Sequence, residues 1–283
     1  MSVRQRQGRQ KATLASLPAA ASRGVRHILD GPRQPGVLLG TSSNAAWIQA
    51  RGHVLVLGGT NAVRLPNGVT VTKPAYAIRS SAGERCMVGE GMLEAGNLRA
   101  SIVRWWDPRP TLAQVSVLSV TGLVEEARKR FVCVDDGGLG EALMSNDAGA
   151  VRHAMCGLLG KGEGLTPEGD DVLVGVLAGL RLLGPALGIL GADGMQAAMA
   201  PIVLTEAPFR TTALSAALLR HAVAGEVADP VAAFLQALTG RIDLAEAIDG
   251  LHTMGNTSGV ATACGVLLAA EFLVRGSVHD GQR

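Results

Sequence analysis

The sequence predicts an α+β protein in which an antiparallel, β-rich part resembling a small barrel precedes a C-terminal part built only of helices. Three observations support this fold class. Before residue 118, short apolar runs alternate with turn residues, and after it apolar residues recur at helical spacing. Of the 283 residues, 47% are hydrophobic but only 3% are aromatic, so a sizeable core must consist mainly of Ala, Val and Leu.

Residues 1–34 are expected to form a basic and mobile N-terminal tail. Seven basic residues precede Pro35, against the single acidic residue Asp30. Such a tail can bind an acidic partner, but a solvated role is commoner and is favoured here. The first residues imitate a signal peptide, yet their apolar part is short and contains Ser16 and Pro18, so export is not expected.

Residues 35–117 are expected to form the β-rich domain. The runs that indicate strands lie at residues 36–40, 46–50, 53–57, 69–72 and 75–79. Asn67-Gly68 is typical of a β-hairpin turn. The tryptophans of the Trp105-Trp106 pair are large anchors, which favours an interface or a domain junction.

Residues 118–283 are expected to form the helical domain. The first helix should be amphipathic, with an apolar side made of Leu118, Leu123 and Phe131. The further helical patterns lie at residues 167–183, 195–204, 212–224, 230–238, 244–251 and 257–274. The apolar stretch 172–192 is long enough for a membrane span, but Arg181 lies at its centre and Gly184-Pro185 interrupts it. Two buried helices of a soluble core explain that stretch better.

Charge and cysteine content exclude several classes of protein. A net charge of +2 offers no general reason to expect nucleic-acid binding. The cysteines are Cys86, Cys133, Cys156 and Cys264, and their spacing fits neither a zinc site nor a disulfide scaffold. We therefore expect reduced cysteines in a cytoplasmic protein.

The segment 160–171, GKGEGLTPEGDD, is the most informative stretch of the chain. Thr166 and Pro167 are typical of an N-cap followed by the first residue of a helix. The glycines before them permit left-handed backbone, and a glycine-rich turn at a helix N-terminus lines up N–H groups that bind anions. The spacing matches neither the Walker nor the Rossmann fingerprint.

The paired carboxylates of Asp170 and Asp171 repel an anion unless they turn away, bind a cation or accept hydrogen bonds from the ligand. A carbamoyl or ureido compound meets the last condition, because it combines N–H donors with an anionic group. The alternative is a capped, buried helix whose acids complement its dipole, and for Glu168 we favour that interpretation. The helical glycines Gly175 and Gly179 share one face, which favours close packing of another helix.

Two later helices begin in the same way. Thr257 and Ser258 precede one apolar helix, and Arg210, Thr211 and Thr212 precede another, which carries Ser215 in its first turn. Ordinary capping explains each start singly. If the three N-termini converge, they form one electropositive pocket with hydroxyls and two carboxylates. His221 and His252 are weaker candidates for a base, because no spacing ties them to the carboxylates.

Four segments together resemble the AllH-like family, a subunit type of oxamate carbamoyltransferase. They are the GLTPxGDD string within residues 162–171, TTALSAALLRHAVAGE (211–226), GNTSGVATACGVLLA (255–269) and WWDP (105–108). The resemblance implies a cytoplasmic, multi-subunit enzyme of allantoin and purine breakdown. That enzyme moves a carbamoyl group between oxalurate and phosphate, giving oxamate and carbamoyl phosphate. The family commonly has proline, serine and histidine in place of Glu163, Glu168 and Asn256, which leaves the substrate open.

The predicted function is therefore that of a carbamoyltransferase subunit acting on a small ureido or oxamate-type acid. A non-catalytic, small-anion-binding or scaffolding subunit is the alternative. The expected catalytic residues are Asp170, Asp171 and Lys161. The expected substrate-binding residues are Gly162, Gly164, Thr166, Gly169, Arg210, Thr211, Thr212, Ser215, Asn256, Thr257 and Ser258. Mg²⁺ is a possible cofactor without identified ligands, and other protein subunits are the expected partners, with neither nucleic acid nor membrane.

Overall fold

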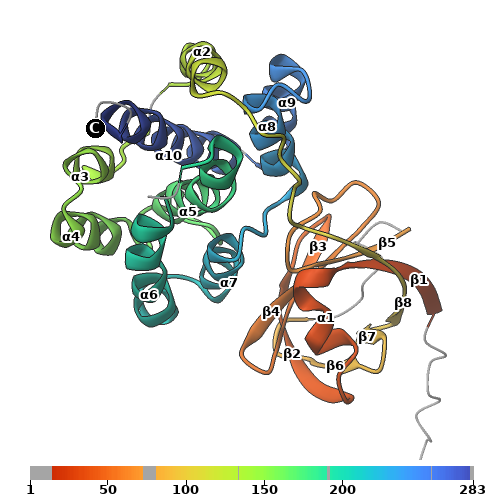
Figure 1. Ribbon diagram of the computed structural model, residues 1–283. Helices are drawn as coiled ribbons and strands as arrows, with labels where there is room; N and C mark the ends of the chain where they lie inside the picture. The colour runs from red at the N-terminus through yellow and green to blue at the C-terminus, as the bar shows by residue number, and fades with distance from the viewer. Residues whose placement is uncertain (1–14, 73–80, 133, 190–191, 256, 281–283) are drawn as a thin grey trace, which may run out of the picture.

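The computed structural model describes residues 15–72, 81–132, 134–189, 192–255 and 257–280. The chain forms two lobes, a β-barrel followed by a cluster of helices, as the sequence predicted (Figure 1). The barrel ends at Trp106 and the first helix of the second lobe begins at Val117.

The barrel is closed, and its strands follow the order β1-β5-β4-β3-β2-β6-β7-β8. They are β1 (Ala15–Ser22), β2 (Gln34–Thr41), β3 (Ala45–Ala50), β4 (His53–Gly58), β5 (Gly68–Val71), β6 (Arg85–Gly89), β7 (Met92–Ala95) and β8 (Leu98–Trp106). Most neighbours pair antiparallel, but β1 runs parallel to β8 and β4 runs parallel to β5. The expected purely antiparallel arrangement therefore needs this correction.

The hairpin expected at Asn67-Gly68 is wrong. Because β4 and β5 are parallel, no tight turn can join them. Asn67 is instead buried, and its side-chain amide donates a hydrogen bond to the Val54 carbonyl at 2.9 Å. The residue holds the start of β5 against β4.

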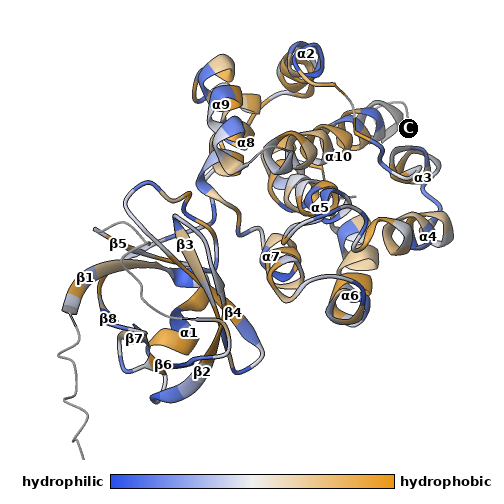
Figure 2. Cartoon of the chain, turned by 180° about the vertical axis from the view of Figure 1, so that it is seen from behind, coloured by the Kyte–Doolittle hydropathy of each residue, from blue (hydrophilic) through white to orange (hydrophobic). Residues whose placement is uncertain are grey.

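The N-terminal tail expected over residues 1–34 also differs from the structure. Residues 1–14 lie outside the described residues, but β1 closes the barrel between β5 and β8. A 3₁₀ turn (Arg23–Val25) and the short helix α1 (Arg26–Leu29) follow. Ile28 and Leu29 are buried with the inward-facing side chains of the strands, so this segment is part of the barrel core (Figure 2).

The strands alternate as expected for a packed barrel. In β2, Leu38 is buried whereas its neighbours Val37 and Leu39 are exposed. The interior is filled by Leu, Ile, Val and Ala side chains from all parts of the barrel. Small residues suffice because eight strands leave room only for side chains.

The second lobe contains the longer helices. They are α2 (Val117–Arg128), α3 (Leu139–Ser145), α4 (Ala148–Leu158), α5 (Glu168–Leu187), α6 (Ala192–Arg210), α7 (Ala213–Val223), α8 (Asp229–Leu238), α9 (Leu244–Leu251) and α10 (Ser258–Asp280). In α2 the buried side chains are Val120, Val124 and Ala127, whereas Leu118 is 84% exposed. The prediction that Leu118 belongs to the apolar side of this helix is therefore wrong. The buried side, with its 3.6-residue period, is formed by Val120, Val124 and Ala127.

The central pair of the lobe is α5 and α10, which pack closely and run parallel. A Cβ added to Gly175 would lie 2.1 Å from the Thr262 carbonyl oxygen, and one on Gly265 would lie 2.1 Å from the Val172 carbonyl oxygen. The prediction that Gly175 and Gly179 are packing residues agrees with this contact. Residues 258–277 are long and apolar enough to cross a membrane, but two thirds of that helix is buried among the other helices.

Helix α5 continues through Gly184-Pro185 to Leu187, so the break expected there is wrong. Pro185 lies in the last turn, where only one backbone hydrogen bond is lost. The helix ends at Gly188, whose φ of 71° gives the left-handed C-cap. The Gln114 side chain donates to the Pro185 carbonyl at 3.2 Å, which satisfies an end group of the helix.

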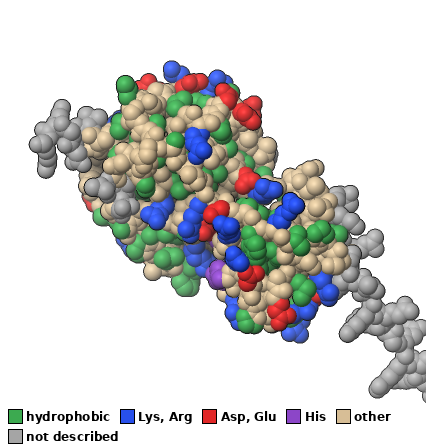
Figure 3. Space-filling model, turned by 45° about the vertical axis from the view of Figure 1, so that its right-hand side comes forward, with side chains coloured by type: hydrophobic (Ala, Val, Ile, Leu, Met, Phe, Trp, Pro, Cys, Tyr) green, Lys and Arg blue, Asp and Glu red, His purple; other side chains and the backbone are tan. Residues whose placement is uncertain are grey.

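The two lobes meet through apolar contacts that have charged groups around them. Val54 and Val56 of β4 pack against Leu214 and Ala217 of α7. Several Lys or Arg side chains gather with acidic ones near the waist between the lobes (Figure 3). The Trp105-Trp106 pair lies near this junction and is only half-buried, with Arg26 and Arg64 over the two rings at 5.2 and 5.6 Å from the ring centroids.

Candidate functional site

The N-termini of α5, α7 and α10 converge on one place in the helical lobe. The Thr166 and Ser258 hydroxyls share a hydrogen bond of 3.0 Å, which joins the starts of α5 and α10. The Thr212 hydroxyl donates to the Leu165 carbonyl at 2.6 Å, which joins the start of α7 to the loop before α5. The positive ends of three helix dipoles therefore face the same region.

These three starts follow the expected capping pattern only in part. Pro167, and not Thr166, occupies the N-cap position of α5, and the Thr166 side chain is free to bond Ser258. Thr212 is the N-cap of α7 as expected, because its hydroxyl accepts the Ser215 N–H at 3.0 Å. Thr257 is exposed, and its carbonyl accepts the Ala261 N–H at 2.9 Å in the first turn of α10.

The glycine loop before α5 requires its glycines. Gly160, Gly162 and Gly164 have φ of 76°, 116° and 90°, which lie in the region that disfavours residues with a Cβ. A Cβ on Gly160 would also lie 2.1 Å from the Arg210 carbonyl oxygen. Gly169 inside α5 is similarly restricted, since its Cβ would lie 2.3 Å from the Leu158 carbonyl oxygen. These residues act through their backbone.

Asp170 is fully buried and accepts three hydrogen bonds. Its Oδ1 accepts the Gly160 N–H at 2.9 Å, and its Oδ2 accepts the Ser215 hydroxyl at 2.7 Å. The Thr211 hydroxyl also donates to Oδ2. The carboxylate thus connects the glycine loop and the start of α7 to α5. Both of its oxygens accept hydrogen bonds from groups of the protein.

Asp171 lies in a different environment, although it is the next residue. It is 5% exposed, and its Oδ2 atom is buried and has no hydrogen-bond partner among the described residues. Burial raises the pKa of this carboxyl to about 8. A hydrogen bond from Ser258 lowers the pKa, whereas the negative charges of Asp170 and Glu168 raise it. Its surroundings therefore favour the protonated form of the Asp171 carboxyl.

Two of the predicted cationic residues bind acids instead of the carboxylate pair. The Lys161 ammonium contacts the exposed Asp135 carboxylate at 2.7 Å. The Arg210 guanidinium contacts Glu206, one turn earlier on α6, at 2.9 Å. Asp135 could not be predicted from the sequence, because it lies 26 positions before Lys161 and no local pattern indicates this contact. Asn256 lies outside the described residues.

The two candidate histidines lie away from the carboxylate pair. His221 Nδ1 bonds the Glu226 carboxylate at 2.6 Å near the junction with the barrel. His252 is exposed in the 3₁₀ turn His252–Met254. Among the residues described, no three His, Cys, Asp or Glu side chains are grouped so as to hold a metal ion. Within the described part of the chain, Cys86, Cys156 and Cys264 are in no disulfide.

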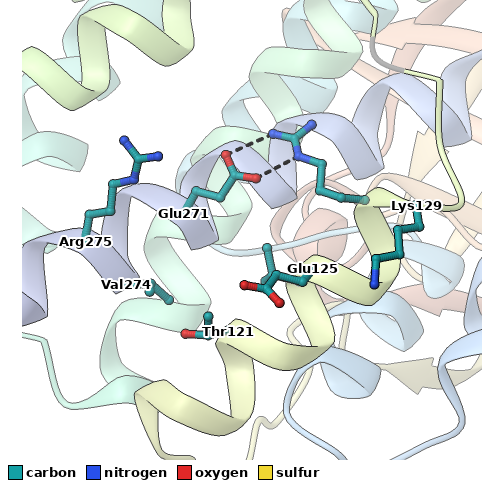
Figure 4. A pocket seen from close by; sticks show the side chains of 8 residues that line it. Thr121, Glu125, Lys129, Glu271, Val274 and Arg275 are labelled. Atoms are coloured by element: carbon teal, nitrogen blue, oxygen red, sulfur yellow. Dashed lines mark hydrogen bonds and ion pairs between the residues drawn. The ribbon is translucent and has the colours of Figure 1, made fainter.

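A separate cavity of about 500 Å³ lies between α2 and the C-terminal half of α10 (Figure 4). Arg128 and Glu271 form a two-pronged ion pair across it, with distances of 2.7 and 3.0 Å. Glu125, Lys129 and Arg275 add charges of both signs. This cavity contains none of the predicted site residues.

Comparison with known proteins finds a family match over the part of the chain that contains the converging N-termini. Residues 158–270 match the family model of oxamate carbamoyltransferase subunit AllH. The resemblance to the AllH family is confirmed. The AllH match begins at the end of α4 and includes the glycine loop, both aspartates and the starts of α5, α7 and α10. No solved structure matches the chain.

The groups at these N-termini are suited to a small anion that also carries polar hydrogens. Helix N-termini and loop N–H groups favour negative oxygens. The Thr166 and Ser258 hydroxyls both donate and accept, and each is only partly buried. Behind them lies a carboxyl group that can hold or release a proton near neutral pH.

Proposed function

We propose that this chain is a subunit of a carbamoyltransferase that moves a carbamoyl group between phosphate and a small oxamate-type acid. The observation that carries the proposal is the extent of the AllH match, which encloses all three converging N-termini. The family description names a subunit of oxamate carbamoyltransferase. A cytoplasmic location and further protein subunits are part of the same proposal.

The chemistry of the transfer suits the groups gathered here. The oxamate amide nitrogen attacks the carbamoyl carbon of carbamoyl phosphate, the bond from that carbon to the phosphate oxygen breaks, and the amide proton ends on the departing phosphate. Charge develops on the carbamoyl and phosphate oxygens, where loop N–H groups and helix N-termini stabilise it. Hydroxyls of Thr166 and Ser258 orient the polar hydrogens of the substrate.

A non-catalytic, anion-binding subunit is the second candidate. It is favoured by the contacts of Lys161 and Arg210, which are paired with Asp135 and Glu206 and bring no cation to the carboxylates. In this case the pocket binds a small anion while another subunit carries out the transfer. The two proposals differ in what the chain does within the assembled enzyme.

The test is to assay carbamoyl phosphate with oxamate, using the chain alone and the chain assembled with the other subunits of an oxamate carbamoyltransferase. We expect the isolated chain to turn over slowly or not at all, and the complex to regain turnover. Each assay is run with and without Mg²⁺. A thermal-shift series with phosphate, carbamoyl phosphate, oxamate and oxalurate measures binding separately, because a ligand of the folded state raises the melting temperature.

Variants then separate the two candidates. If Ser258→Ala in the complex abolishes turnover while carbamoyl phosphate still raises the melting temperature of the chain, the site is catalytic. If turnover survives while the ligand-induced shift is lost, the chain is a binding subunit. Absence of any shift with all four compounds, together with inactive complexes, contradicts both proposals.

A further inference from the structure

The position of the Asp171 carboxyl limits how it can act. Its Oδ2 is buried and has no partner among the residues that the structure describes, so a ligand arriving from solvent does not touch this oxygen directly. Ser258 contacts the carboxyl from the start of α10 and is partly exposed. Thr166, also partly exposed, shares a hydrogen bond with the Ser258 hydroxyl. A chain of polar groups therefore leads from the buried carboxyl to the exposed rim of the site.

We propose that Asp171 is the proton store of this site and exchanges its proton with the substrate through the Ser258 hydroxyl. In this arrangement Ser258 is the residue that touches the substrate, and Asp171 is a positioning residue behind it. The inference rests on the proposed carbamoyl transfer and adds the proton route that this transfer requires.

Asp170 cannot fill this role. Both of its oxygens already accept hydrogen bonds, from Gly160, Ser215 and Thr211. Asp170 therefore serves as the acceptor that holds the glycine loop and α7 in place. The two neighbouring aspartates thus differ in role: Asp170 is a structural hydrogen-bond acceptor, and Asp171 is the acid proposed to store the proton.

The charged groups that act on Asp171 come from α5 itself, namely Asp170 and Glu168, and both favour the protonated form. The neighbouring starts of α7 and α10 contribute the hydroxyls of Thr211, Ser215 and Ser258. Burial in this setting keeps the proton on the carboxyl at neutral pH, as a proton donor requires.

The proton step balances within the site. As the bond between the carbamoyl carbon and the phosphate oxygen breaks, the Ser258 hydroxyl gives its proton to that oxygen and takes the proton of Asp171. The attacking amide nitrogen then loses its proton to Ser258, which returns a proton to the Asp171 carboxylate. The phosphate leaves as a hydrogen phosphate dianion, and both residues end as they began.

The first experiment measures the stored proton without any assay of turnover. The melting temperatures of the wild-type chain and of Asp171→Asn are compared from pH 5 to pH 9. In the unfolded chain the carboxyl ionises near pH 4, whereas in the folded chain it ionises near pH 8. The folded state therefore holds an extra proton between these values, and the stability of the wild type falls as the pH rises.

We expect the melting temperature of Asp171→Asn relative to wild type to rise steadily from pH 5 to pH 8 and then level off. The asparagine cannot ionise, and all other groups cancel in the comparison. Asp243→Asn, an exposed N-cap of α9, is the matched control and should show no such trend. A flat difference for Asp171→Asn overturns the proposal, because no proton is then stored.

The second experiment uses the assembled enzyme with carbamoyl phosphate and oxamate. We expect Ser258→Ala and Asp171→Asn each to lower kcat by about 10²–10⁴-fold, the usual contribution of proton transfer, with a smaller effect on KM. Ser258→Thr keeps a hydroxyl and should retain most of the rate. Ser277→Ala, at the other end of α10, is the matched control.

The pH profile distinguishes a proton route from a structural role. Wild-type kcat should fall above about pH 8 as Asp171 loses its proton, and the residual activity of Asp171→Asn should lack that fall. A wild-type rate in Ser258→Ala overturns the relay. Absence of turnover by the wild-type complex overturns the proposed function and the relay with it, whereas the melting series still shows whether Asp171 is protonated.

Discussion

At the scale of single residues, the site depends on how two adjacent carboxylates are surrounded. Asp170 accepts hydrogen bonds from Gly160, Thr211 and Ser215. The buried Oδ2 of Asp171 accepts no hydrogen bond from the described residues. The residue type alone therefore does not predict the role of either aspartate. The two differ because donors on the glycine loop and α7 reach Asp170. The sequence predicts a catalytic role for both, and the geometry separates them.

The first prediction concerns Asp170. Asp170→Ala leaves the Gly160 N–H and two hydroxyls without their acceptor, and each buried donor that stays unsatisfied costs about 1–3 kcal/mol. We expect a fall of about 3 kcal/mol in the free energy of unfolding, measured by urea denaturation at pH 7. Asp147→Ala removes an exposed N-cap of α4 and serves as the control, at about 1 kcal/mol. Equal losses in the two variants would show that Asp170 is not the structural anchor.

At the scale of elements, the closeness of α5 and α10 brings two helix N-termini to one place. Their contact depends on glycines, since Gly175 and Gly265 each approach the opposite backbone too closely for a side chain. A parallel pair of this kind places Thr166 beside Ser258. The same packing that fills the core thus assembles the site.

The second prediction compares two helical glycines. Gly175→Ala places a Cβ 2.1 Å from the Thr262 carbonyl oxygen and should destabilise the protein by about 1–3 kcal/mol through overpacking. Gly122→Ala in α2 meets no atom within 4 Å and should stabilise it by about 0.5–1 kcal/mol through helix propensity. Thermal unfolding measures both. A stabilising Gly175→Ala would mean that the helices can move apart without cost.

Helix starts and the fold class could be predicted from the sequence, because capping residues and hydrophobic periods are local signals. The Thr212 cap is an example, since Ser215 lies only three residues away. Closure of the barrel by β1 could not be predicted, because a strand rich in alanine and containing Pro18 has little β propensity and forms only through its neighbours. The contact of Thr211 with Asp170 spans 41 residues and has no local signal either.

At the scale of the whole molecule, the junction between the lobes gathers titratable groups from both. His27 and His53 of the barrel lie with ring centroids 5.0 Å apart, and His221 of α7 bonds Glu226 close to Gly24. Arg109 also bonds Glu226 at 3.0 Å, from the segment that links the lobes. Apolar contacts and the charged groups around them therefore hold the two lobes together.

The third prediction concerns the pH dependence of this junction. Burial lowers the pKa of His53, and the positive charges of His27, Arg220 and His221 lower it further. The folded protein then binds fewer protons than the unfolded chain below about pH 6.5, so stability falls as the pH falls through that value. His53→Gln should reduce the loss of urea stability between pH 7.5 and pH 5. An unchanged loss would place the titrating group elsewhere.

The last prediction follows from the two faces of α7. Leu214 and Ala217 pack on β4 of the barrel, whereas Ser215 of the same helix bonds Asp170. The barrel therefore supports the helix that carries part of the site. Val56 lies in this contact and outside the barrel interior, so Val56→Asp places a carboxylate in the apolar junction while leaving the interior of the barrel intact.

We expect Val56→Asp to expose the segment 107–116 to limited proteolysis and to reduce the melting-temperature shift produced by carbamoyl phosphate, although Val56 is not among the residues that form the site. Val103→Asp, a 63% exposed position on β8, is the matched control and should change neither measurement. If Val56→Asp opens the junction and the full ligand-induced shift persists, the barrel does not support the site. In that case α7 is held by Asp170 and the glycine loop alone, through the hydrogen bonds of Thr211, Thr212 and Ser215.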